Sequence, residues 1–214
     1  MQSQSRTRSV VLSGLSIALI AVGAAVILPL GPVPFTLQTL MVILVLLVLT
    51  PKEGIVTVGA YLVLGTIGLP FFAGFTGGIG ILLGPTGGFL MGFLVATLLV
   101  GLVRLGQKGR VGQVELGQKG QKGRGKLSHV PNLRLSLLLD IVSIIIVIVV
   151  THTLGMLWFM YITGSTLASA LTFCVIPFLI PDIIKAIVAF SCAQPIRVAL
   201  GRAMWHKSQI EDDE

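Results

Sequence analysis

Charged residues are scarce in this sequence. Lys, Arg, Asp and Glu together form 11% of the 214 residues and aromatic residues 7%, whereas 54% are hydrophobic and the mean hydropathy is +0.99. This composition excludes a soluble globular domain and a disordered chain, and it indicates an integral membrane protein. A bilayer core of about 30 Å requires about 20 apolar residues per helix, so the length accommodates about five to seven spans in one domain.

Motifs that would indicate catalysis or a bound metal are also missing. Cys174 and Cys192 are the two cysteines and lie in apolar runs without a ligand cluster, so neither a disulfide nor a metal site is expected. The sequence lacks the Gly-rich loop ending in Lys-Ser or Lys-Thr that binds ATP phosphates. We interpret His152 as a packed intramembrane histidine rather than a catalytic base. The chain is therefore not expected to be an enzyme, and no cofactor is expected.

Apolar runs separated by short breaks predict an all-α membrane protein with about six transmembrane helices. The runs cover residues 10–30, 37–50, about 55–69, about 89–103, about 135–160 and 182 to about 200. Residues 167–179 fit a short additional helix. The first run exceeds the roughly 7–15 apolar residues of a signal peptide, so a cleaved leader is disfavoured.

Three breaks between these runs contain proline or glycine but no charge. They lie at residues 31–38, 70–88 and near Gly164, and the second holds seven glycines and two prolines. Non-helical backbone at membrane depth is tolerated where it is buried in protein or lines a cavity. We therefore expect residues 70–88 to fold back over a pocket, with a flexible loop as the alternative.

Residues 105–133 interrupt the apolar pattern with a basic, glycine-rich sequence in which Leu-Gly-Gln-Lys occurs twice. Such low-complexity composition predicts a disordered cytoplasmic linker that touches anionic lipids, and nucleic-acid binding is not expected.

The basic residues also predict the orientation of the chain. With six spans, every one of the 15 Lys and Arg residues except Lys185 lies on the side of the N-terminus. Cytoplasmic loops carry the excess of Lys and Arg in membrane proteins, so both termini are predicted to be cytoplasmic and the three uncharged breaks to lie outside.

Asp182 and Lys185 form the opposite-charge pair that lies deepest in apolar sequence. A charge at the centre of a membrane helix costs about 2.5–3.5 kcal/mol and usually faces a bundle interior or a cavity. Residues three apart share one helical face, and Pro181 suits a helix start. We interpret the pair as an acceptor and a donor presented to a pocket. An ordinary ion pair at the membrane surface is the alternative.

A pocket above this pair would combine apolar walls with a few directed polar groups, which is the usual composition of a small-molecule site. The residues expected to build it are Phe35, Thr36, Gln38, Phe72, Phe75 and Thr76. Acid, amine, amide and hydroxyl groups together suit a neutral or zwitterionic solute with N–H and C=O groups and an apolar body.

Small residues recur on one face of the first apolar run. Gly14, Ala18, Ala21 and Ala25 follow spacings of four, three and four. Such files let another helix approach closely inside lipid. Packing within the chain and docking of a separate partner both remain open from this pattern alone.

Four ordered motifs in the sequence resemble the biotin-specific substrate-binding subunit (BioY) of energy-coupling-factor transporters. They occupy residues 30–38, 61–74 and 84–88, and the last is Pro177-Phe178 followed by Asp182 and Lys185. Phe89 stands where the family pattern predicts tyrosine, Ile180-Pro181 stands where it predicts Pro-Gly, and the linker is longer.

The resemblance implies a six-helix subunit in the plasma membrane of a prokaryote that captures biotin from outside. It also implies docking on a transmembrane coupling subunit driven by two ATPases, with the small residues of the first helix as the docking surface. Asp182 would accept from a ureido N–H, and Lys185 would donate to a ureido or carboxylate oxygen. The implied binding residues are Phe35, Thr36, Gln38, Tyr61, Phe72, Gly74, Phe75, Thr76, Thr86, Asp182 and Lys185.

Two other classes of function stay open at this point. One is a solitary carrier that works without ATPases and uses Asp182 or Asp140 as a proton site. The other is a membrane assembly protein in which the outer loops only pack.

Overall fold

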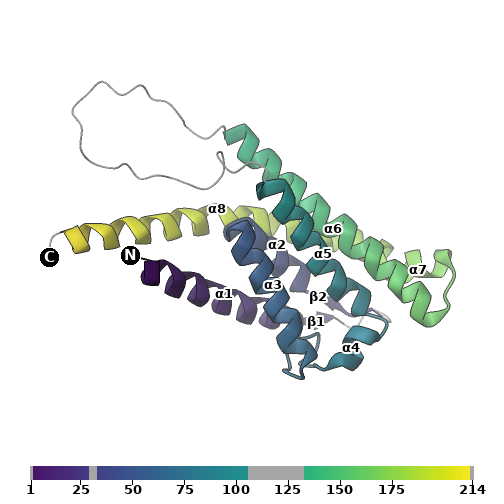
Figure 1. The fold of residues 1–214 in the computed structure, drawn as a ribbon. Coiled ribbons are helices and arrows are strands. Elements are labelled where there is room, and N and C mark those ends of the chain that lie inside the picture. Colours follow the sequence, from purple (N-terminus) through teal and green to yellow (C-terminus); the bar gives the residue numbers. More distant parts are fainter. Residues whose placement is uncertain (1, 29–32, 106–132, 213–214) are drawn as a thin grey trace.

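The computed structural model describes residues 2–28, 33–105 and 133–212, and it describes side chains within 7–28, 33–105 and 134–200. Most of these residues are helical (Figure 1). The elements are α1 (Gln2–Ala25), β1 (Ile27–Leu28), β2 (Phe35–Thr36), α2 (Gln38–Val48), α3 (Pro51–Thr66), α4 (Ile79–Leu83), α5 (Gly87–Leu105), α6 (Leu133–Thr163), α7 (Leu167–Cys174) and α8 (Ile176–Asp212).

Four apolar segments within the described residues are long enough to cross a membrane. They are Thr7–Ala25, Gly87–Leu105, Arg134–Thr163 and Leu167–Leu200. The predicted helical membrane protein is therefore confirmed, whereas the count of six spans and the cytoplasmic termini stay predictions. With 11 residues, α2 is about 16 Å long at 1.5 Å per residue, which is shorter than a bilayer core. Most of the predicted linker, residues 106–132, lies outside the described residues.

Two predicted helix boundaries are wrong. The first helix ends at Ala25 rather than near residue 30, because β1 and β2 pair antiparallel, with Ile27 opposite Thr36. The last helix begins at Ile176 rather than at Asp182. Val175 ends α7 with a φ of −124°, and Pro177 then occupies the first turn of α8, where a missing N–H costs nothing. Asp182 consequently lies inside a continuous helix.

Glycines bring α5 and α6 into close contact. Gly88 of α5 lies against Trp158 and the Leu154 carbonyl, and Gly155 of α6 lies against the ring of Phe89. A Cβ added to Gly92 would come within 2.8 Å of the Thr151 Cα. Small residues allow helices to approach closely where lipid provides no hydrophobic drive. This contact fixes which face of α6 turns toward α5.

A buried ionic cluster joins α5, α6 and α8 to the end of α2. Asp140 lies 2.8 Å from both Arg104 and Arg197. Arg104 Nη1 donates to the Leu46 carbonyl at 2.7 Å, and Arg197 Nε donates to the Leu47 carbonyl at 2.7 Å. The last carbonyls of a helix have no partner within the helix, so the two arginines cap α2. Arg104 therefore belongs to the helical bundle.

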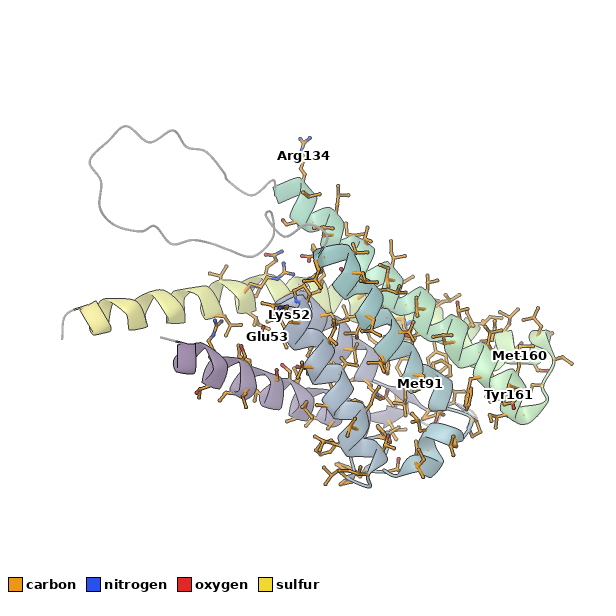
Figure 2. The ribbon with its side chains drawn as sticks, viewed as in Figure 1. Lys52, Glu53, Met91, Arg134, Met160 and Tyr161 are labelled. Atoms are coloured by element: carbon orange, nitrogen blue, oxygen red, sulfur yellow. The ribbon has the colours of Figure 1, made fainter. Side chains whose placement is uncertain are left out.

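The two ends of the molecule differ in composition. In Figure 1 the N-terminal start of α1 and the C-terminal end of α8 lie toward one end of the molecule, whereas β1, β2, α4 and α7 lie toward the other. Figure 2 shows Arg134 and Tyr161 at opposite ends of α6. The uncharged breaks thus gather at one end, which is the arrangement that the predicted orientation requires.

The packing of α5 on α6 predicts that Gly92→Ala destabilises the protein, because the added methyl group meets the α6 backbone. We expect a loss of about 1–3 kcal/mol, which is typical of overpacking, measured as thermal unfolding in detergent. Gly59→Ala in α3 is the matched control, since a Cβ there meets nothing within 4 Å. Equal unfolding temperatures for the two variants would contradict this account.

Candidate functional site

One pocket brings together the break that contains α4, the region of β2 and α2, and helices α5, α6 and α8. The pocket is partly open to the surroundings, and it combines apolar walls with a few polar groups, as small-molecule sites do. The lining residues are Val33, Pro34, Thr36, Gln38, Thr39, Phe72, Ala73, Ile81, Thr86, Phe89, Leu90, Phe93, Thr151, His152, Phe178, Asp182 and Lys185. Residues 70–88 thus supply part of the wall.

Asp182 and Lys185 form a buried ion pair in this wall. The Lys185 Nζ lies 2.8 Å from the Asp182 Oδ1, and the side chains are 5% and 1% exposed. The same Nζ lies 3.8 Å from the centroid of the Phe35 ring, which stacks on Phe178 with centroids 5.6 Å apart. A cation over an aromatic face is attracted by the ring quadrupole. Both side chains of the pair are therefore enclosed by the protein.

Tyr61 supports the pocket from behind, although the sequence predicts it as a contact. The Gln38 Nε2 donates to the Tyr61 hydroxyl at 2.9 Å, and that hydroxyl donates to the Phe71 carbonyl at 2.9 Å. Both Gln38 and Tyr61 are buried. Tyr61 therefore orients the amide of Gln38, which does line the pocket, without lining it itself.

Besides Tyr61 and Phe35, three predicted residues of one loop do not line the pocket, namely Gly74, Phe75 and Thr76. Gly74 has a φ of +70° and Phe75 one of +59°, so the chain makes a left-handed turn there. The Phe75 side chain is consequently 72% exposed. The Thr76 hydroxyl donates to the Ala73 carbonyl at 2.8 Å, and the Gly74 N–H donates to the Ala24 carbonyl. These residues shape the loop, and its neighbours Phe72 and Ala73 face the pocket.

Of the predicted binding residues, the structure brings six to the pocket wall. They are Thr36, Gln38, Phe72, Thr86, Asp182 and Lys185. Phe35 lies behind Lys185, as described above. The binding role of each remains a prediction.

His152 and its neighbour Thr151 were missed as pocket residues. The sequence interpretation places His152 in simple packing, whereas the structure puts its Nε2 3.2 Å from the Asp182 Oδ2. Its ring packs between Phe89 and Phe178, with centroids 6.0 and 5.9 Å away. The signal that could have found it is the one that found Asp182, namely an ionisable side chain inside an apolar run.

The four small residues of α1 differ in their surroundings. Gly14 and Ala18 are exposed, whereas Ala21 and Ala25 are partly buried. Ala21 packs against the central hydrophobic cluster of the chain. Packing within the chain therefore accounts for Ala21 and Ala25. The exposed pair Gly14 and Ala18 is available to a partner.

The site can bind a solute, and nothing in its geometry indicates metal chemistry. No group of three or more His, Cys, Asp or Glu residues that could hold a metal ion occurs in the part of the chain that the structure describes. A carboxylate, an ammonium, an imidazole, an amide and several hydroxyls face a space bounded by aromatic rings. This combination suits a solute with both N–H and C=O groups and an apolar body.

Comparison with known proteins identifies the family. The model of the BioY family matches residues 1–202. The chain belongs to the BioY family. It is 35% identical over 192 residues to the probable biotin transporter BioY of Pyrococcus horikoshii, covering 90% of this chain and 98% of that one. It is 36% identical over 203 residues to the biotin transporter BioY2 of Lactococcus lactis subsp. cremoris, covering 91% and 94%.

A solved structure supports the same assignment. The fold matches the crystal structure of the S-component for biotin from an ECF-type ABC transporter with a TM-score of 0.73 and 25% identity, covering 92% of this chain and 94% of that one. The resemblance to BioY noted in the sequence is thus confirmed. All four of its motifs contribute residues to the pocket wall, and the motif at 61–74 supplies the supporting Tyr61 as well.

The hydrogen bonds of Tyr61 predict that Tyr61→Phe destabilises this BioY-family fold. Removal of the hydroxyl leaves the buried Gln38 amide and the Phe71 carbonyl without their partner, which costs about 1–3 kcal/mol. Tyr161→Phe is the control, because Tyr161 is 79% exposed. Thermal unfolding in detergent measures both, and a Tyr61→Phe protein as stable as the Tyr161→Phe protein would contradict the supporting role.

Proposed function

We propose that this chain captures biotin in the pocket beside Asp182 and Lys185. It then serves biotin uptake across the plasma membrane of a prokaryote as the substrate-binding subunit of an ATP-driven energy-coupling-factor transporter. The observation that carries the proposal is the buried Asp182–Lys185 pair in the wall of a partly aromatic pocket. Membership of the BioY family, whose relatives are named biotin transporters, supports the choice of solute.

The chemistry of biotin matches the pocket group by group. Its ureido ring has two N–H donors and one carbonyl acceptor, its fused rings are apolar, and its side chain ends in a carboxylate. Asp182 accepts from a ureido N–H, and Lys185 donates to the ureido or the carboxylate oxygen. Aromatic rings such as Phe72, Phe89 and Phe93 pack on the apolar rings.

Energy coupling requires partners that this chain does not itself provide. We infer that it docks through α1 on a transmembrane coupling subunit that associates with two ATP-binding cassette ATPases. Exposed apolar side chains on α1 support this, including Val11 at 61%, Leu15 at 68% and Val22 at 62% exposure. The described match to a component of an ECF-type ABC transporter agrees with it. The termini and residues 105–133 would lie in the cytoplasm, and nucleic acid is not a partner.

The solitary carrier receives less support from the geometry. It requires a proton site, and the candidates were Asp140 and Asp182. Asp140 contacts two arginines and Asp182 contacts Lys185. Both carboxylates thus already have basic partners within the protein.

We predict that Asp182→Asn and Lys185→Ala each weaken biotin binding while the protein still folds and inserts. Removal of one partner of a buried, hydrogen-bonded charge pair costs about 2–5 kcal/mol in binding, which is a rise in Kd of roughly 30-fold or more. Calorimetry on the purified chain measures this. Lys52→Ala is the control, since Lys52 is exposed and outside the pocket. Normal binding by both pocket variants would refute the site.

We further predict that Ala18→Trp abolishes ATP-driven uptake and co-purification with the coupling subunit but leaves biotin binding by the isolated chain unchanged. The bulky ring would block a close helix approach on the exposed face of α1. Ala168→Trp on α7 is the control, because Ala168 is also exposed. Uptake that survives Ala18→Trp, or that needs no ATPase, would argue for a different docking surface or for the solitary carrier.

A further inference from the structure

Polar atoms without partners gather in one wall of the pocket. Within the described side chains, four buried nitrogen or oxygen atoms lack a hydrogen bond, namely Thr57 Oγ1, Thr151 Oγ1, His152 Nε2 and Asp182 Oδ2. The last three belong to residues that line the pocket. Buried polar atoms are nearly always paired, and an unpaired one costs about 1–3 kcal/mol. Their concentration at one place makes this wall suited to bind a polar group of a ligand.

The hydrogen bond of the other imidazole nitrogen determines what His152 offers to the pocket. Nδ1 lies 2.9 Å from the carbonyl oxygen of Ile148, which can only accept, so Nδ1 carries a proton. In the neutral ring Nε2 then holds a lone pair. It lies 3.2 Å from the Asp182 Oδ2, and the two atoms form no hydrogen bond. Both are acceptors in this state, and neither satisfies the other.

One of the two carboxylate oxygens of Asp182, Oδ1, already has a hydrogen-bond partner. Oδ1 accepts from the Lys185 Nζ at 2.8 Å, so Oδ2 is the oxygen that remains for a ligand. The rings of Phe89 and Phe178 pack against the imidazole with interplanar angles of 86° and 62°. They hold the ring in the orientation in which Nε2 faces Asp182.

We infer that His152 is a solute-binding residue whose unprotonated Nε2, together with the Asp182 Oδ2, accepts one N–H group of the solute. A proton on Nε2 turns this nitrogen into a donor, which bonds to the Asp182 Oδ2 and occupies the acceptor that the solute needs. The proton and the solute therefore compete for this site. Solute binding weakens as the pH falls, and at low pH solute binding is accompanied by release of a proton. The inference rests on the proposed function, in which the N–H belongs to the ureido ring of biotin.

The other ionisable groups in the pocket wall are few. From α8 they are Asp182 and Lys185, whereas α2 presents the uncharged Gln38 and Thr39 and α5 presents Phe89 among its apolar lining residues. Tyr61, behind Gln38, has its hydroxyl bonded on both sides. A pH dependence that disappears when His152 alone is replaced is therefore attributable to its imidazole.

The test uses a protein in which His152 is the only histidine, made by His129→Gln and His206→Gln. Biotin affinity is measured by calorimetry at pH 8 and pH 5.5, at the lower pH in two buffers of different ionisation heat. We expect Kd to rise toward low pH, by no more than about tenfold per pH unit for a single competing proton, with proton release at pH 5.5. Adding His152→Gln should weaken binding at pH 8 and remove most of the pH dependence, because Asp182 and Lys185 are retained.

Nitrogen-15 NMR of the single labelled imidazole provides a readout that needs no further variant. We expect an unprotonated Nε2 in the biotin complex at pH 5.5, and an imidazolium there would overturn the inference. An unchanged affinity and pH profile in the His152→Gln protein would also overturn it, while leaving biotin as the solute. Absence of biotin binding to the unmodified chain at both pH values would overturn the proposed function and the inference with it.

Discussion

The interior of a bilayer offers no water to buried polar groups, and this constraint organises the structure. Each ionised side chain that lies deep in the described helices must find a partner inside the protein. Asp140 of α6 meets Arg104 of α5 and Arg197 of α8, so helices from distant parts of the chain are held together by charge. Asp182 meets Lys185 within α8. The pocket wall is where the constraint is incompletely met. A binding site of this kind differs from the rest of the bundle by the hydrogen bonds that it leaves for a ligand.

The sequence predicts structure well where a residue type is energetically unfavourable inside a bilayer. Asp182 and Lys185 stand out because charge is rare within apolar runs, and the structure places both in the pocket wall. The break at 70–88 stands out because glycine and proline prevent a continuous helix, and it lines the same pocket. Local rules thus predicted the helical class and much of the polar part of the site.

Features that depend on how helices rotate and pair could not be predicted in this way. Asp140 finds its arginines 36 and 57 residues away in the sequence, and no local pattern indicates that pairing. Likewise, His152 faces the pocket because glycines set the contact between α5 and α6. The prediction that Phe75 lines the pocket is wrong for a local reason, because a short left-handed turn directs its side chain away from the pocket. Apolar spacing alone identified neither effect.

The short helix α2 connects the pocket wall to the buried ionic cluster. Gln38 at its beginning lies in the pocket wall, and the Leu46 and Leu47 carbonyls near its end are held by Arg104 and Arg197. Helix α8 borders both ends, through Asp182 and through Arg197. Sliding of α2 along α8 would break the hydrogen bond from Arg197 to the Leu47 carbonyl, and a hydrogen bond to a charged group contributes about 1.5–3 kcal/mol. Helix α2 is therefore fastened to α5 and α8 at its C-terminal end, while its first residue remains part of the pocket wall.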